Sequence, residues 1–117
     1  MGKAFAIFGL VVAIALLTPA DPTLAEQRAQ FGEGTKSCGQ WTQARQIADE
    51  NIVLMAQWIA GFLSGLNAES TGTDFLKDTD FDDMVAWVDK HCQERPLDIL
   101  ATAALKLRNE LQSTAMR

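Results

Sequence analysis

Residues 49–67 decide the fold, and they read DENIVLMAQWIAGFLSGLN. Apolar side chains recur there in steps of three and four residues, the spacing of an α-helix: Ile52, Met55, Ile59, Phe62, Leu63 and Leu66. A polar wedge is confined to Gln57 and Ser64, and beside it runs a second row made of Leu54, Trp58, Gly61 and Gly65. A helix that is apolar nearly all round must be buried on most sides. We therefore predict the central helix of a bundle, or a helix that also faces a second subunit.

Gly61 and Gly65 in this helix have the GxxxG spacing, which lets another backbone approach closely. The polar side chains of Asp49, Glu50 and Gln57 argue against a membrane span. Each glycine costs a helix roughly 1 kcal/mol, so we expect a packing reason for the pair. The neighbour is either another part of the same chain, which we favour, or a second copy in a homodimer.

Three further helices are predicted around the central one, and no strand pattern is evident. Ser37 is a suitable N-cap for a short helix through Arg45. Another begins near Asp80 with an apolar face of Phe81, Met84, Val85, Val88 and Cys92. Pro96 ends it and fits the first turn of the last helix, whose stripe is Leu97, Leu100, Ala101, Ala104, Leu107 and Leu111. The prediction is an all-α fold: a small four-helix orthogonal bundle over 37–112, with 113–117 frayed.

Residues 1–25 have the layout of a secretory signal peptide. One lysine precedes the unbroken apolar run Ala4–Leu17, and small residues follow before the first glutamate. Fourteen helical residues span about 21 Å, too short for the hydrocarbon core of a membrane. We predict cleavage after Ala25, or alternatively after Ala20, and a periplasmic or secreted protein with no stable membrane span afterwards. The polar segment 26–36 is predicted to be a flexible arm.

The mature chain of 92 residues would be one domain with fourteen acidic and nine basic side chains. Its net charge near −5 disfavours nucleic acid and anionic membrane surfaces as partners. In strong acid the carboxylates are protonated, and the remaining cationic groups give a net charge of about +11.

Cys38 and Cys92 are the two cysteines, and in an exported chain they most simply form one intramolecular disulfide. Two free thiols and an intermolecular bridge are the alternatives. The closed loop would hold 55 residues. The chain-entropy model gives such a loop about 4 kcal/mol of stability, comparable to the whole stability of a small domain.

An acidic run lies near the third helix: Asp74, Asp78, Asp80, Asp82 and Asp83. Within it Asp78, Asp80 and Asp82 alternate as calcium-loop ligands do. Asp89 stands where the last ligand of a calcium loop would fall, but Asp83 takes the position that requires glycine. We interpret the run as a cap for the helix and a complement to its dipole.

His91 is the only histidine and lies next to Cys92. One histidine and one thiol are too few ligands for zinc, and we interpret His91 as a surface residue near a helix C-terminus. The sequence has no phosphate-binding glycine loop and no CxxC motif. We therefore expect no catalytic residue, no metal, no cofactor and no enzymatic activity.

A candidate partner surface is formed by residues of the second row and by Trp87, which lies off the stripe of the third helix: Leu54, Trp58, Gly61, Gly65 and Trp87. An off-stripe tryptophan either packs on a loop, which we favour, or belongs to a binding surface.

The cysteine placement and helix pattern resemble a known family. The segments that carry the resemblance are SCGQW at 37–41, GFLSGLN at 61–67 and HCQERP at 91–96. From Ser37 to about Leu111 the chain resembles the HdeA/HdeB group of small periplasmic acid-stress chaperones. The GFLSG piece also resembles exported immunity proteins of the Tai type, which block type VI secretion effectors but usually carry more cysteines.

The first resemblance implies a folded, inactive dimer at neutral pH that acid dissociates or unfolds. The apolar surface exposed in this way then binds other unfolding proteins. The expectation is a non-enzymatic binding protein with unfolded clients; the alternative is an immunity-type protein with one dedicated protein partner.

Overall fold

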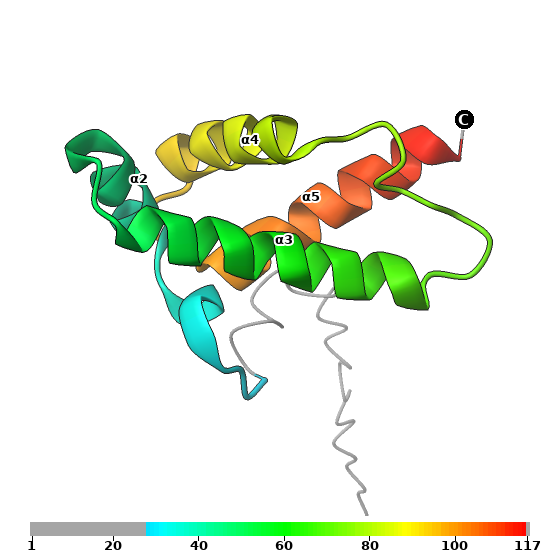
Figure 1. Cartoon of the computed structure of the whole chain (residues 1–117), viewed down its shortest axis with the longest axis horizontal. Coiled ribbons are helices and arrows are strands. Elements are labelled where there is room, and N and C mark those ends of the chain that lie inside the picture. The colour runs from blue at the N-terminus through cyan, green and yellow to red at the C-terminus, as the bar shows by residue number, and fades with distance from the viewer. Residues whose placement is uncertain (1–27, 117) are drawn as a thin grey trace, which may run out of the picture.

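The computed structural model describes residues 28–116, so the predicted signal peptide and its cleavage sites lie outside the described residues. The described part contains one 3-10 turn and four α-helices (Figure 1): η1 Gly32–Thr35, α2 Cys38–Ile47, α3 Asn51–Glu69, α4 Phe81–Glu94 and α5 Leu100–Ala115. The predicted all-α fold of four helices is confirmed. Within 28–116 no strand forms, and one isolated antiparallel bridge joins Ser37 to Ile99.

Two helices begin with a capping box, in which the N-cap and N3 residues bond each other's backbone amides. The Ser37 hydroxyl accepts from the Gln40 amide at 3.1 Å, and the Gln40 side chain accepts from the Ser37 amide at 2.9 Å. Asp80 and Asp83 make the same pair of contacts at the start of α4. The predicted N-cap Ser37 is confirmed, and within the acidic run Asp80 and Asp83 cap α4.

The core lies where α3 meets the other three helices. α3 buries Met55, Ala56, Ile59 and Leu63. Facing them are fully buried side chains of the other helices: Trp41, Val88, Leu100, Ala104 and Leu107. In Figure 1 α3 runs the length of the bundle, with α5 crossing it and α4 lying alongside.

α3 is the central helix, as predicted, but one side of it is open in the single chain. Its most apolar stretch of 18 residues has a mean hydropathy of 1.2, yet only 22% of that stretch is buried. By length and composition it is the one described helix that would suffice to cross a membrane, a property that long core helices share.

The turn between α4 and α5 differs from the prediction. α4 ends at Glu94, but α5 begins at Leu100 rather than at Pro96. The intervening backbone pairs with the entry of α2: Cys38 N donates to the Asp98 carbonyl at 2.7 Å, and Leu100 N donates to the Lys36 carbonyl at 2.9 Å. These bonds tie the turn to the start of α2, and Leu97 is left 91% exposed instead of lying on the stripe of α5.

The predicted disulfide between Cys38 and Cys92 is confirmed, with the two Cα atoms 4.6 Å apart. Both half-cystines are buried. The bond joins the first residue of α2 to the last turns of α4, beside the backbone pairing just described. The disulfide and the backbone hydrogen bonds therefore meet at this end of the bundle.

The two predicted ends of the domain also differ from the structure. The segment expected to be a flexible arm contains η1, which packs against α3 and α5. At the other end, α5 continues to Ala115, three residues beyond the predicted limit of 112. The Thr114 hydroxyl donates to the Glu110 carbonyl at 3.1 Å in this last turn.

Candidate functional site

One uncharged face of α3 points away from the rest of the described chain. We call it the outer face; its residues lie seven, four and three positions apart and so share one side of the helix: Leu54, Gly61, Gly65 and Ala68. Leu54 is 57% exposed. α3 carries no charged side chain from Asn51 to Ala68. An exposed stripe without charge over more than four helical turns is a candidate for contact with another protein.

The two glycines of the outer face have no close neighbour in the described chain. A methyl group added at Gly61 or at Gly65 would meet nothing within 4 Å. The expectation that another part of the same chain packs on them is therefore wrong for the residues described. The alternative predicted neighbour is a second copy in a homodimer.

Trp58 lies at the edge of the outer face, where η1 covers part of it. Its indole nitrogen donates to the Phe31 carbonyl at 2.9 Å, and its ring stacks on Phe62 with centroids 5.0 Å apart. A side chain at Gly34 would overlap the Trp58 ring, so only glycine permits this close approach. Trp58 holds η1 in place as well as bordering the outer face.

Trp87 belongs to a different contact cluster, between α4 and α5. Its indole nitrogen donates to Glu110 at 3.0 Å, and its ring stacks on the His91 imidazole with centroids 4.9 Å apart. The structure therefore gathers Leu54, Gly61 and Gly65 on one face of α3 and ties Trp87 to α5.

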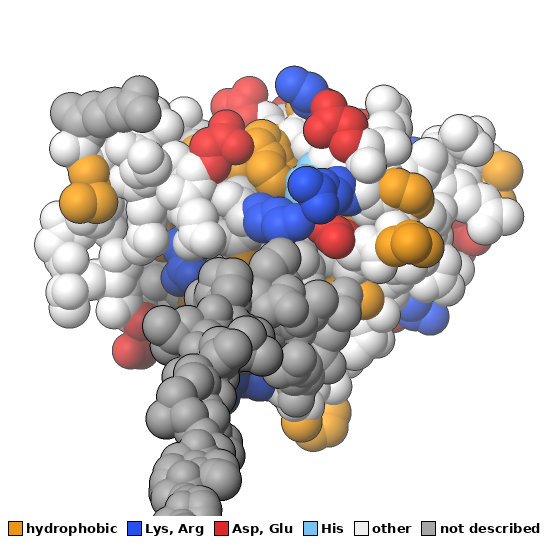
Figure 2. Space-filling model, turned by 180° about the vertical axis from the view of Figure 1, so that it is seen from behind, with side chains coloured by type: hydrophobic (Ala, Val, Ile, Leu, Met, Phe, Trp, Pro, Cys, Tyr) orange, Lys and Arg blue, Asp and Glu red, His pale blue; other side chains and the backbone are white. Residues whose placement is uncertain are grey.

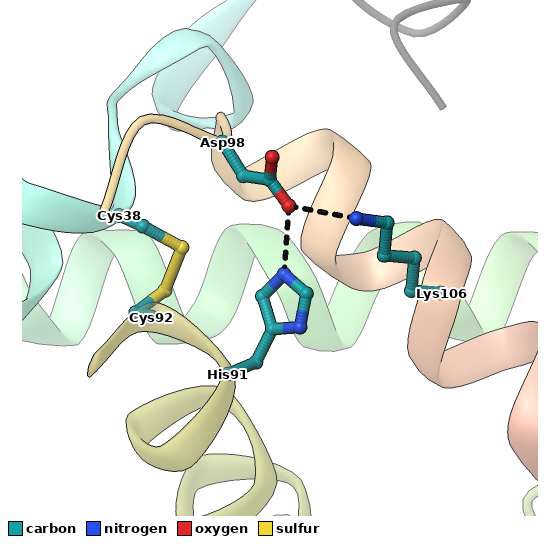
Figure 3. A network of polar contacts seen from close by, with 5 residues as sticks. All are labelled: Cys38, His91, Cys92, Asp98 and Lys106. Atoms are coloured by element: carbon teal, nitrogen blue, oxygen red, sulfur yellow. Dashed lines mark hydrogen bonds and ion pairs between the residues drawn. A yellow bond between two sulfur atoms is a disulfide. The ribbon is translucent and has the colours of Figure 1, made fainter. Parts of the chain in front are cut away.

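His91, Asp98 and Lys106 form a polar cluster that sequence reasoning did not find (Figure 3). Asp98 Oδ2 lies 2.9 Å from His91 Nε2 and 2.9 Å from Lys106 Nζ. The side chain of His91 is only 10% exposed, so the interpretation of a surface histidine is wrong. On the side drawn in Figure 2, little of the histidine is visible among acidic and basic side chains.

Burial and charge act in opposite directions on Asp98. Burial by itself would raise the pKa of this carboxyl. The hydrogen bonds and positive charges of Lys106 and His91 outweigh burial, and they hold the pKa of Asp98 below its ordinary value of 3.8. The carboxylate is thus the form that the folded state favours.

A second ion pair joins α2 to α4. Arg45 donates to both oxygens of Asp89, at 2.9 Å and 2.8 Å, and the Trp41 indole donates to the same carboxylate at 2.8 Å. The hydrogen bond that Arg45 donates to the Asp89 carboxylate raises the pKa of Arg45. Asp89, weighed above as a last calcium ligand, is therefore engaged by two side chains. The described residues hold no group of three or more His, Cys, Asp or Glu arranged for a metal ion.

A groove between α3 and α4 was not expected from the sequence. It consists of two hollows, of about 240 Å³ and about 170 Å³, that share Phe81. We call it the α3–α4 groove. One hollow is lined by Trp41, Arg45, Ile52, Val53, Ala56, Gln57, Phe81 and Val85, the other by Ala60, Leu63, Ser64, Leu76, Thr79, Asp80, Phe81 and Met84.

Two neighbouring surfaces of α3, the outer face and the wall of the groove, are thus the candidate binding sites. No protein-family model, no curated protein and no solved structure matches the chain.

Proposed function

We propose that this protein is a non-enzymatic, exported binding protein that contacts other proteins through the outer face of α3. The observation that carries the proposal is the absence of charge from Asn51 to Ala68 on a helix whose most apolar stretch is only 22% buried. Covering apolar surface is favourable by about 25 cal/mol per Å². A soluble chain therefore gains by covering this face.

A second copy is one cover for the outer face at neutral pH. The large side chain of the outer face, Leu54, lies in the first half of α3, and Gly61 and Gly65 lie in the second half. An antiparallel pair of α3 helices about a two-fold axis places Leu54 of each copy against the glycines of the other. Such a dimer would keep the apolar face hidden until the copies separate.

The more specific proposal is an acid-activated chaperone of HdeA type. Asp98 supports it, because the lowered pKa means that this carboxylate stabilises the folded state. That contribution is present above the ordinary pKa and is lost as the pH falls through the lower pKa of the folded state. Acid also makes the chain strongly cationic, which would keep a complex with an unfolded client soluble.

The test of the chaperone proposal is client aggregation measured against pH, with and without reductant. We expect suppression of the aggregation of a periplasmic client near pH 2–3 and none at pH 7. Sedimentation should give a dimer at pH 7 for the parent chain and for Val53→Gln, and a monomer for Leu54→Gln. If the protein suppresses aggregation at none of the pH values, the chaperone activity is refuted.

A dedicated protein partner, as in an immunity protein, is the second candidate function. The observation that favours it is that Leu54 on the outer face is open in the folded chain. It predicts one tight partner at neutral pH, captured from periplasm by the parent chain and lost with Leu54→Gln. A capture at pH 7 that yields no specific protein contradicts it.

A further inference from the structure

We propose that the α3–α4 groove binds a cationic amphipathic helix of a partner protein while this protein is folded at neutral pH. The inference rests on the proposed function in so far as both require a binding protein. It uses a different surface, however, and it can fail or hold independently of the outer face.

The wall that α3 contributes to the groove has the length and spacing of a helix-binding surface. Val53, Ala56, Ala60 and Ser64 line it at successive turns. Eleven residues of helix rise about 16 Å, which spans three turns of a docked helix. Helices that dock in grooves present apolar side chains at positions i, i+3 or i+4, and i+7, and they need a wall of this length.

Phe81 divides the groove into two hollows and remains 44% exposed. It is the first residue of α4, a helix that contacts α2 more extensively than α3. The volumes of about 240 Å³ and about 170 Å³ suit separate side chains. Sites for small molecules more often enclose about 300–1,000 Å³. A chain with apolar anchors on both sides of Phe81 fits better than a single compact ligand.

The charges around Phe81 select a cationic partner. Asp78, Asp80 and Asp82 lie within three residues of Phe81, and all three are exposed. Lys77 is the one basic residue in this stretch, and the Arg45 guanidinium on the opposite wall is already bound by Asp89. The α3 wall carries no charge. Complementary potentials favour a partner with Lys or Arg beside its apolar stripe and disfavour an acidic one.

The experiment uses two synthetic helices of about 18 residues, one of leucine and lysine and one of leucine and glutamate. Calorimetry at pH 7 on the oxidised protein should give at least about tenfold tighter binding for the lysine peptide. In amide NMR spectra the lysine peptide should shift Val53, Ala60 and Phe81. Equal binding of both peptides, or shifts centred on Gly61 and Gly65, would overturn the proposal.

Val53 and Leu54 provide a matched pair of variants. They are adjacent, 59% and 57% exposed, and only Val53 lines the groove. Val53→Gln should weaken the binding of the lysine peptide by about tenfold, because it replaces an apolar contact by a polar one. Leu54→Gln should leave the affinity within about twofold. Equal effects of the two substitutions would contradict binding of the peptide in the groove.

A charge variant tests the acidic rim separately. The double substitution Asp78→Asn and Asp82→Asn should weaken the lysine peptide by about fivefold and reduce the salt dependence of its binding. Unchanged affinity and salt dependence would contradict the charge argument.

If no peptide binds while Leu54→Gln still disrupts the dimer, this inference fails and the proposed function stands. If the lysine peptide binds but no aggregation is suppressed and no partner is captured, this inference stands and the proposed function fails.

Discussion

At the scale of single residues, Asp98 connects three parts of the molecule. Its carboxylate contacts His91 and Lys106, and its backbone carbonyl accepts from Cys38 at 2.7 Å. The sequence could not reveal this cluster. His91 and Asp98 are seven residues apart across a turn that helical periodicity misplaced, because backbone hydrogen bonds tie that turn to the entry of α2.

The substitution Asp98→Asn is expected to lower the free energy of unfolding at pH 7 by about 2 kcal/mol, since it leaves Lys106 and His91 without a carboxylate. The difference should shrink as the pH falls from the ordinary pKa of 3.8 through the lower pKa of the folded state, where the parent carboxyl becomes protonated as well. Denaturant unfolding at a series of pH values measures both effects.

Asp78 supplies the control for this prediction, because it is an exposed residue in the loop before α4. Asp78→Asn should change the free energy of unfolding by no more than about 0.5 kcal/mol. A variant Asp98→Asn with the parent's stability at pH 7 would show that burial cancels the charge interactions of this residue.

At the scale of elements, α3 illustrates what the spacing of apolar residues can and cannot predict. The repeat of apolar residues placed the helix within two residues of its observed bounds. It could not tell which apolar row is covered, because Leu54, Gly61 and Gly65 look as apolar as the buried row. Exposure of that face depends on where α4 and α5 pack, and this is a property of tertiary structure.

Gly61→Ala tests whether the open glycine face serves a partner. Alanine meets no atom within 4 Å and favours the helix, so the free energy of unfolding of the monomer should rise by about 0.5–1 kcal/mol. The same methyl group should weaken the proposed dimer. Thermal unfolding at low protein concentration and sedimentation at high concentration separate the two effects.

Gly34→Ala is the matched control, because there the added methyl group overlaps the Trp58 ring. It should destabilise the chain and alter the fluorescence of Trp58. If Gly61→Ala stabilises the monomer and leaves association unchanged, the outer face is not the dimer contact.

At the scale of the whole molecule, the fold class and the disulfide were predictable because both depend on few, global features. Amphipathic segments separated by loops indicate a helical bundle, and two cysteines at the ends of helices allow one bridge. The binding surfaces depend instead on small gaps between helices. Both hollows of the α3–α4 groove are lined by Phe81, and no residue pattern records how α3 and α4 are placed around it.

The double variant Cys38→Ala and Cys92→Ala should lose about 4 kcal/mol of stability, the value that the chain-entropy model gives for the closed loop. Calorimetric melting of the oxidised, reduced and double-variant proteins measures this loss. The reduced and double-variant proteins should melt at similar temperatures, well below the oxidised form. Equal melting temperatures for all three would mean that the bridge adds no net stability.

The disulfide bond between Cys38 and Cys92 also determines how the molecule responds to a mechanical force. α3 lies wholly between the two half-cystines, which are 54 positions apart in the chain. Tension applied to the two termini passes through the sulfur atoms and bypasses that segment. About 180 Å of extended chain then stays out of reach until the bond is reduced. The helix that carries both candidate surfaces is thereby shielded from pulling and from end-first threading through a narrow pore.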